Sequence, residues 1–348
     1  MIVENRYEVS PNTAAGGMGE VLECVDLHLD RRVVIKRLQL GVEERRILDE
    51  QKSLVKLRSK NVVQMYDVVN LSDRGFTEVG VVLEYLTGKD LEPGTFNVGT
   101  SLLKVLWQIA SGLCDIHQAG VIHRDIKPEN IRVDAEGVVK IFDFGLARLE
   151  EDAKTNSLIG TVAYMAPELW GQRPISFSSA VDVYAFGVLS VALVDKSFAL
   201  PSKIRSRKED IASVSACLSG LHPEILSIIS ACMDKDAAAR PSMCDVAKIL
   251  EKHILKDRHR ALVVMDGTLH ELDSAHKTIS LKARDVGDIS IGYDGFDFKV
   301  LSCSGAVYLN NSRVGAGDIV PGCCVITFGS TGKRKFVTFD VSNPEVAV

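Results

Sequence analysis

The chain has 348 residues, more than one ordinary domain holds and enough for two, since most domains contain about 100–200 residues. Hydrophobic residues make up 46% and charged residues 25%, a balance typical of globular proteins that excludes disordered and fibrous classes. The formal net charge of −5 offers no basic excess to neutralise phosphates, so we expect no nucleic-acid partner.

The first residues carry no targeting pattern, and the most apolar stretch carries no membrane pattern. Residues 1–6 lack the basic start, apolar run and small-residue cleavage site of a signal peptide. The stretch from Val181 to Val194 contains Asp182 and is too short to span a bilayer, so it predicts a buried core helix. We therefore expect no membrane partner and a cytoplasmic location. The scattered cysteines, without a C-x-x-C pair, predict reduced thiols that fill core space.

The first eighty or so residues are strand-rich. Runs of β-branched residues at Glu20–Val25 and Arg32–Leu38 lie on either side of a turn at Asp26–Asp30, which predicts a hairpin. Between Val42 and Leu57, apolar positions recur at helical spacing among charges and predict an amphipathic helix. This part therefore predicts a small β-rich lobe with one helix.

Helical periodicity dominates from Leu102 to about His253. A loop-rich section from Val121 to Pro174 interrupts it and contains nearly all the Gly and Pro punctuation. A small β-rich part followed by a larger helical part predicts an α+β domain of two lobes with a cleft between them. We place this domain at residues 7–257.

After Arg260, short alternating runs bounded by Gly, Asp, Asn or Pro predict a small all-β sandwich at residues 261–348. In the last run Val337, Phe339 and Val341 share one face, which the alternation of a strand predicts to be the core face. The predicted strands are Lys277–Ala283, Asp288–Tyr293, Phe296–Leu301, Ala306–Leu309, Cys324–Phe328 and Lys335–Val341.

Three short motifs in the loop-rich section carry the chemistry. Residues 123–130 read His-Arg-Asp-Ile-Lys-Pro-Glu-Asn, residues 143–145 read Asp-Phe-Gly, and residues 166–168 read Ala-Pro-Glu. In order and separation they resemble the H-R-D-x-K-P-x-N, D-F-G and A-P-E motifs of protein kinases, here of the bacterial (Hanks) serine/threonine type. The resemblance implies a bilobal kinase fold, transfer of the γ-phosphate of ATP to Ser or Thr hydroxyls of protein substrates, and Mg²⁺ or Mn²⁺ as cofactor.

The resemblance also implies roles for single residues of these motifs. Asp125 would orient the substrate hydroxyl and accept its proton, and Lys127 would lie against the γ-phosphate. Asn130 and Asp143 would hold the metal ions through hard oxygen ligands. The protein's part in such a reaction is to place two oxygens in line and to neutralise charge on the transferred group.

Upstream segments complete the implied nucleotide site. Lys36 ends the run Val-Val-Ile-Lys, so the resemblance implies that it contacts the α- and β-phosphates and pairs with Glu50. Residues 13–21 resemble a glycine-rich loop whose backbone amides approach phosphates without an intervening Cβ. The implied nucleotide-binding residues are Thr13, Ala14, Ala15, Gly16, Gly17, Met18, Gly19, Val21, Val34, Lys36, Glu84, Leu86 and Arg132.

Three of these residues depart from the kinase pattern. Ala14 replaces the first glycine of the loop, Val34 stands where Ala is usual, and Arg132 stands where an apolar residue normally forms the floor under adenine. Arg132 either lays its guanidinium on the base or pushes into the space that the base needs. A second hypothesis therefore stays open, namely a pseudokinase or scaffold with an altered nucleotide pocket, although a scaffold has no physical need to keep the full set of catalytic residues.

The resemblance adds expectations about regulation and support. Arg124 precedes Asp125, and kinases with that arginine commonly depend on a phosphate in the activation segment. Thr155 and Ser157 are the hydroxyl residues between Gly145 and Thr161, so we expect autophosphorylation there, through a transient homodimer. Structural roles are implied for Asp182, which would tie down the catalytic loop, and for Arg240, which would pair with Glu168.

The C-terminal module carries a weaker resemblance. Residues 307–314, 321–322 and 325–329 resemble the second half of a forkhead-associated (FHA) domain, a β-sandwich that binds phosphothreonine peptides. The Gly-Arg and S-x-x-H elements that hold phosphate in that family are missing, because Tyr293 follows Gly292. A degenerate FHA-like module, an unrelated β-sandwich and a competent phosphopeptide reader all stay open. We expect the module to recruit a protein partner or to regulate the kinase domain.

Overall fold

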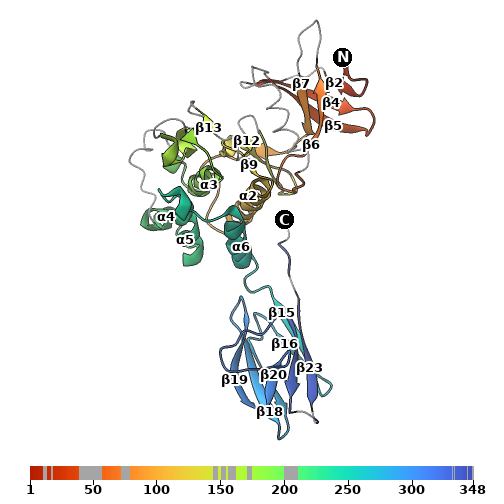
Figure 1. Ribbon diagram of the computed structural model, residues 1–348, viewed down its shortest axis with the longest axis vertical. Helices are drawn as coiled ribbons and strands as arrows, with labels where there is room; N and C mark the ends of the chain where they lie inside the picture. Colours follow the sequence, from red (N-terminus) through yellow and green to blue (C-terminus); the bar gives the residue numbers. More distant parts are fainter. Residues whose placement is uncertain are drawn as a thin grey trace. The chain divides into compact units, whose positions relative to one another are not determined.

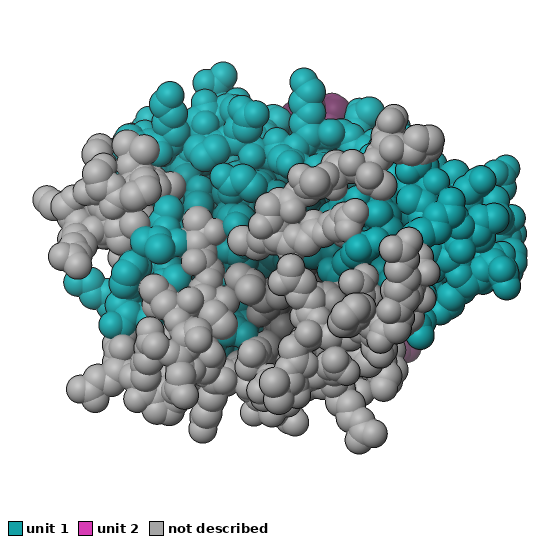
Figure 2. Space-filling view, turned by 90° about the horizontal axis from the view of Figure 1, so that it is seen from above, with its two compact units in different colours: residues 1–250, 348 teal, residues 251–347 magenta. Residues whose placement is uncertain are grey.

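The computed structural model describes residues 1–10, 14–16, 19–38, 57–71, 79–143, 148–149, 154–155, 162–170, 175–199, 211–330, 332, 334–342 and 344–346. The chain divides into two compact units, residues 1–250 and residues 251–347, which Figure 2 colours teal and magenta. The predicted fold class is confirmed, since the first unit combines a β-rich part with a helical part and the second unit contains only strands after α6. The domain limits 7–257 and 261–348 stay predictions.

An antiparallel sheet opens the first unit, with strand order β1-β2-β4-β5-β7-β6 and β3 paired to β4 (Figure 1). Its middle strands follow from β-branched runs that alternate between the two faces. Val33 and Ile35 are fully buried on one face, whereas Val34 and Lys36 are half-buried on the other. The strands are β1 Ile2–Val3, β2 Tyr7–Val9, β3 Ala14–Gly16, β4 Gly19–Asp26, β5 Arg31–Leu38, β6 Met65–Asn70 and β7 Val79–Glu84.

Helices dominate the rest of the first unit (Figure 1). The helix predicted from the apolar stretch after Val181 is α3, and every residue from Val181 to Ala192 is buried in it, so it is a core helix as predicted. Among the described residues, none of the helices has the length and apolar character needed to cross a membrane. The helices are α2 Thr100–Gln118, α3 Ala180–Ala192, α4 Ile211–Cys217, α5 Pro223–Cys232 and α6 Met243–Ile254.

Short elements arrange the loop-rich section around these helices. One small sheet has the order β11-β10-β8, and two strand pairs join β12 to β9 and β13 to β14. The 3₁₀ turn η1 Pro128–Asn130 falls within the first motif, η4 Val162–Tyr164 precedes the third, and η5 Pro167–Trp170 begins within the third. The strands are β8 Lys89–Asp90, β9 Val121–Ile122, β10 Ile131–Val133, β11 Val139–Ile141, β12 Arg148–Leu149, β13 Lys154–Thr155 and β14 Ile175–Ser176.

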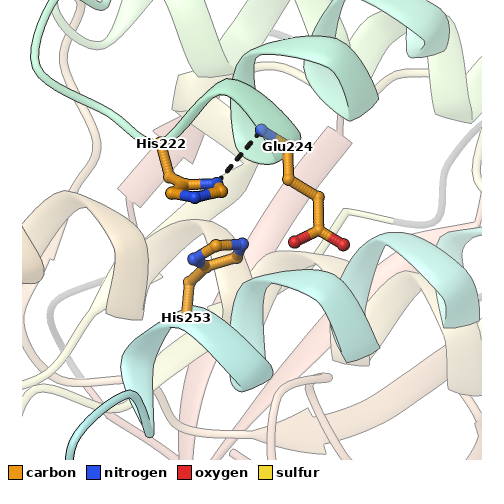
Figure 3. A group of neighbouring side chains, drawn as sticks. All are labelled: His222, Glu224 and His253. Atoms are coloured by element: carbon orange, nitrogen blue, oxygen red, sulfur yellow. Dashed lines mark hydrogen bonds between the residues drawn. The ribbon is translucent and has the colours of Figure 1, made fainter. Parts of the chain in front are cut away.

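The start of α5 shows how a polar side chain ends a loop and begins a helix. His222 is the N-cap, and its ring Nδ1 accepts the backbone N–H of Glu224 at 3.2 Å (Figure 3). Pro223 follows at the first helical position, where its missing N–H costs nothing. His253, the third residue labelled in Figure 3, belongs to the second compact unit.

The cysteines correct one prediction. Cys114 in α2 and Cys244 in α6 form a disulfide, although all the cysteines were predicted to be reduced thiols. The two residues are 130 positions apart, so only the packing of the two helices brings their sulfur atoms together. The other cysteines are free thiols, and Cys24, Cys232 and Cys324 are buried as predicted.

The second unit contains two sheets, one with strand order β16-β15-β23-β22-β20-β21 and one with β17-β18-β19. Both sheets contribute to one apolar core, in which the rings of Phe298 and Phe339 lie edge to face at 5.4 Å between centroids. The predicted core face of the last strand is confirmed, since Val337, Phe339 and Val341 are buried there. The strands are β15 Arg260–Met265, β16 Thr268–Leu272, β17 Thr278–Ala283, β18 Gly287–Tyr293, β19 Phe298–Gly305, β20 Val307–Leu309, β21 Ser312–Arg313, β22 Cys323–Phe328 and β23 Lys335–Ser342.

Candidate active site

Two of the predicted site residues meet although 107 positions separate them. Lys36 comes from β5 and Asp143 follows β11, and the Lys36 ammonium forms an ion pair with the Asp143 carboxylate. Strand alternation explains why Lys36 is available, because its neighbour Ile35 turns into the sheet core and Lys36 turns to the opposite face. Val21 lies directly across from Lys36 in the register of β4 and β5. The sheet therefore presents its lysine to the loop that carries Asp143.

A second cluster forms within the segment 125–130. Asp125 Oδ2 lies 2.7 Å from the ammonium of Lys127 and accepts a hydrogen bond of 3.0 Å from the side-chain amide of Asn130. The same amide donates to the backbone carbonyl of Asp125 at 2.7 Å, which fixes its orientation. Because the nitrogen of the Asn130 amide faces Asp125, its oxygen is the atom with ligand chemistry to offer.

The ring of His123 joins these two clusters. Its Nε2 lies 3.0 Å from the carbonyl oxygen of Phe142, the residue before Asp143, and its Nδ1 accepts the backbone N–H of Asp125 at 3.4 Å. A carbonyl only accepts and an N–H only donates, so the ring is neutral with its proton on Nε2. Complete burial lowers the pKa of His123, which keeps that neutral form. Phe142 N–H also donates to the Asn130 carbonyl at 3.0 Å.

Asp182 of α3 holds the backbone of the same loop. Its Oδ1 and Oδ2 accept the N–H groups of Arg124 and His123, each at 2.8 Å, and Nε2 of His117 lies 3.0 Å from Oδ2. Burial alone would raise the pKa of Asp182, but the hydrogen bonds from His117 and from the Arg124 N–H outweigh it and hold the pKa below its ordinary value. The buried carboxylate is thus ionised and clamps the loop before Asp125.

Two residues beside these clusters adopt left-handed backbone conformations. Arg124 has φ of 70° and Asp143 has φ of 65°, a region that non-glycine residues rarely occupy. Such conformations cost about 1–3 kcal/mol each and persist where the surroundings impose them. The Arg124 guanidinium stacks 3.9 Å from the centroid of the Phe177 ring. Asp143 is itself a predicted metal ligand and Arg124 immediately precedes Asp125, so both strained positions lie within the motifs.

A further ion pair supports the segment that ends at Glu168. The guanidinium of Arg240 binds both carboxylate oxygens of Glu168, at 2.7 and 2.8 Å, and its side chain is fully buried. It also donates to the backbone carbonyls of Ala180 and Asp234, each at 2.8 Å. A bidentate pair with two extra acceptors satisfies the buried guanidinium. The Ala-Pro-Glu motif is therefore tied to the start of α3.

Comparison with known proteins agrees with this geometry. Residues 7–252 match the protein kinase domain family. The chain belongs to the protein kinase family. It is 32% identical over 263 residues to a probable serine/threonine-protein kinase, pknA2, of Bifidobacterium longum, covering 69% of this chain and 34% of the relative. It is 29% identical over 257 residues to serine/threonine-protein kinase PknL of Mycobacterium tuberculosis, covering 69% of this chain and 63% of that protein. The match to PknB of Corynebacterium glutamicum is 30% over 208 residues, with 56% and 32% covered. The chain thus spans about a third of the length of the first of these relatives.

The departure at Arg132 has a defined environment in this kinase. Arg132 lies opposite Asp90 in the register of β10 and β8, and its Nε donates to Asp90 Oδ1 at 2.7 Å. Its Nη1 donates to the carbonyl of Leu86 at 3.1 Å, and its guanidinium lies 5.1 Å from the centroid of Phe142. The sequence did not indicate Asp90. The charge of Arg132 is therefore paired at the edge of the predicted base pocket.

Other predicted nucleotide contacts are placed in part. The Glu84 carboxylate pairs with the Lys140 ammonium at 2.9 Å and accepts the backbone N–H of Gln64 at 3.0 Å. The side chain of Glu84 is therefore engaged within the protein. In the glycine-rich segment, β3 and β4 form a hairpin with Gly16 opposite Gly19. The side chains of residues 11–20 lie outside what the structure describes, so Ala14, Ala15, Gly16 and Gly19 are placed by backbone alone.

Five predicted residues of this kinase lie outside the described residues, namely Thr13, Gly17, Met18, Glu50 and Ser157, together with the predicted helix between Val42 and Leu57 up to residue 56. Thr155 is described by its backbone in β13, where it lies opposite Ile175 of β14. The pairing of Glu50 with Lys36 and the phosphorylation of Thr155 and Ser157 therefore stay predictions. The sequence interpretation also missed His117, because a single histidine within a helix belongs to no motif that would have indicated a role.

A small hollow lies against the buried side of the catalytic loop. Asp125 and Asp182 line it together with the apolar side chains of Met165 and Leu169 and the ring of Tyr164. The residues that contribute them belong to the motif segments and to α3. The hollow is lined by buried side chains and has room for about one water molecule.

Proposed function

We propose that this chain is an ATP-dependent protein kinase that phosphorylates serine or threonine hydroxyls of protein substrates, and that it works in the cytoplasm, where ATP is available. The observation that carries the proposal is the convergence of Lys36 and Asp143 with the hydrogen-bonded group of Asp125, Lys127 and Asn130, joined through His123 and Phe142. Family membership supports it, although the chain spans only part of its relatives.

The residue types fit a nucleotide triphosphate with a divalent cation. The Asp143 carboxylate and the Asn130 side-chain oxygen are hard donors of the kind that Mg²⁺ and Mn²⁺ prefer. The bound cation would supply neutralisation of phosphate charge. Lys36, whose ammonium pairs with Asp143, would bind phosphate oxygens beside the cation. Lys127 adds a second ammonium next to Asp125, where charge on the transferred group needs a partner.

Proton transfer would fall to Asp125. Its carboxylate is held by Lys127 and Asn130, so its remaining lone pairs point in a fixed direction. A substrate hydroxyl beside this carboxylate would donate to it, and the carboxylate would orient the oxygen and take its proton. Asp182, through the N–H groups of His123 and Arg124, would keep that alignment.

We further propose that the kinase regulates itself by autophosphorylation of Thr155 or Ser157 in a transient homodimer. Arg124, stacked on Phe177 next to Asp125, is the cation placed to respond to a phosphate on that segment. Binding of the phosphate would act on the same loop that holds the catalytic carboxylate. Mapping of phosphosites on purified protein tests this, and an unlabelled Thr155 and Ser157 would count against it.

For the second unit we propose recruitment of a protein partner or regulation of the kinase unit. The position that holds phosphate-binding arginine in FHA domains is Tyr293, whose ring is buried and whose hydroxyl donates to the Gly295 carbonyl at 2.8 Å. This inward tyrosine argues against phosphopeptide reading at that position and favours a degenerate FHA-like module. Titration of the full chain with phosphothreonine peptides tests it, and saturable binding would restore the reader hypothesis.

The decisive experiment compares the protein with Asp125→Ala in phosphate transfer from labelled ATP with Mg²⁺. We expect a loss of about 10²–10⁴-fold, the usual contribution of a positioned acid–base group. Nucleotide-induced thermal stabilisation should persist, since Asp125 is not proposed to bind ATP. The matched control is Glu129→Gln, an exposed carboxylate of the same η1 turn, which should stay active. Absence of nucleotide binding by the unmodified protein would favour the scaffold hypothesis, to which Ala14, Val34 and Arg132 point.

A further inference from the structure

The disulfide between Cys114 and Cys244 lies outside the proposed catalytic machinery. Cys114 belongs to α2 and Cys244 to α6, and their Cα atoms are 4.9 Å apart. Both residues are partly exposed, and the side-chain amide of the exposed Gln118 donates to the Cys244 sulfur at 3.4 Å. A dissolved reagent can therefore approach this bond.

Three of the free cysteines, Cys24, Cys232 and Cys324, differ from this pair because they are buried, whereas Cys217 and Cys303 are partly exposed as the pair is. Burial raises the pKa of Cys24 to about 11, that of Cys232 to about 12 and that of Cys324 to about 11. Such thiols remain protonated and shielded, so they react slowly with oxidants and disulfides. Cys323, which is exposed in the second unit, is the natural comparison for simple accessibility.

On the side of α2, the disulfide lies one helical turn before a residue that supports the catalytic loop. Cys114 precedes His117 by three positions, which places both on neighbouring turns of the helix. His117 contacts the Asp182 carboxylate, which in turn binds the N–H groups of His123 and Arg124. A shift of α2 would thus be transmitted to the loop that carries Asp125.

On the side of α6, the disulfide lies close to the second support. Cys244 follows Arg240 by four positions, and Arg240 binds Glu168 and the carbonyl of Ala180, the first residue of α3. Asp182 is two residues further along that helix. The covalent bond therefore joins α2, which carries His117, to α6, which begins three residues after Arg240, and both His117 and Arg240 bind groups in the first turn of α3.

We propose that Cys114 and Cys244 form a thiol–disulfide site that dithiols open and oxidants close, and that its state sets the stability of the kinase unit and the alignment of its catalytic loop. In the opening step a dithiol thiolate attacks one sulfur, the S–S bond breaks and the other cysteine leaves as a thiolate that takes up a proton. The second dithiol sulfur then displaces the first cysteine. The protein gains two electrons and two protons, and the dithiol becomes a disulfide. A peroxide or small disulfide carries out the reverse oxidation.

The first test measures the bond and its effect on stability in the full chain. Non-reducing digestion and mass spectrometry should yield one cross-linked peptide pair, Cys114 with Cys244, that disappears after dithiol treatment. The thermal midpoint of the first unit should fall by about 10 °C on reduction, because a closed loop of 130 residues restricts the unfolded chain strongly. C114S/C244S should show the low midpoint with or without dithiol, and C323S should respond as the unmodified protein does.

The second test measures phosphate transfer at a temperature where the reduced protein is still folded, and this arm alone rests on the proposed kinase activity. Reduction should lower kcat several-fold with little change in KM for ATP, since the loop and not the nucleotide contacts is loosened. Reoxidation by a small disulfide should restore kcat in C323S but not in C114S/C244S. Two free thiols at these positions in air-oxidised protein, or a midpoint that ignores dithiol, would overturn the proposal whether or not the chain is active.

Discussion

In the first unit the buried polar and charged side chains include Asp125, Asn130 and Asp182, whereas in the second unit Thr327 is the one such residue among those described. Burying a polar group costs free energy unless hydrogen-bond partners satisfy it. The first unit must meet this cost at several positions, whereas the second unit largely avoids it. Buried charged groups are expected where chemistry requires them in a fixed geometry. The second unit has an apolar core, so any binding that it performs belongs to its surface.

The contrast between the two units would be wrong if the buried polar network contributed little to the stability of the first unit. We expect Arg240→Ala to lower the free energy of unfolding of that unit by about 3 kcal/mol or more, because Glu168 and two backbone carbonyls lose their donor. Lys248→Ala is the control, since Lys248 is 76% exposed and lies 3.9 Å from Asp245. Chemical denaturation measures both. Equal effects of the two substitutions would show that the buried pair is not special.

The second unit should respond to the loss of apolar volume instead. Phe339→Ala removes a fully buried ring and should cost about 3–5 kcal/mol, enough to unfold that unit alone. Phe336→Ala, on the opposite face of the same strand and 62% exposed, should have almost no effect. Amide hydrogen exchange of the full chain separates the two units. Protection lost equally in both units after Phe339→Ala would contradict their independence.

The next prediction concerns Arg132 at the edge of the predicted nucleotide pocket of the first unit. Arg132→Leu should raise KM for ATP about 3–10-fold with kcat unchanged, because a guanidinium fixed by Asp90 and Leu86 can stack on a base. Arg132→Lys, which keeps the charge and loses the plane, is the control and should behave like Arg132→Leu. A lower KM after Arg132→Leu would show that the guanidinium instead obstructs the base.

The smallest expected effect is a dependence of the thermal midpoint of the first unit on pH. His123 has a lowered pKa when folded, so below about pH 6.5 the unfolded chain binds a proton that the folded one refuses. Stability is therefore present above that pH and declines as the pH falls toward 5. Thermal midpoints of the protein and of His123→Asn between pH 7 and 5 measure the difference in slope. An unchanged pH slope after His123→Asn would contradict the assignment.

The sequence by itself determined the local features of this protein. Motif order at 123–130, 143–145 and 166–168 was enough for the family, and alternation placed Val337, Phe339 and Val341 in the core. The helix after Val181 was recognisable because nearly every position in it is apolar. Periodicity and short motifs depend on residues that are close along the chain, so they can be recognised without knowledge of the fold.

The tertiary structure decided which distant side chains meet. The pairing of Lys36 with Asp143, the Cys114–Cys244 disulfide and the hydrogen bond that joins Arg132 to Asp90 connect positions 107, 130 and 42 apart, and the sequence interpretation of the cysteines was wrong for that reason. Contacts between such distant positions depend on how helices and sheets pack against each other, which a pattern along the chain does not show. The missed hairpin of β15 and β16 is a different case, because its Asp266–Gly267 turn is a local signal that the sequence interpretation overlooked.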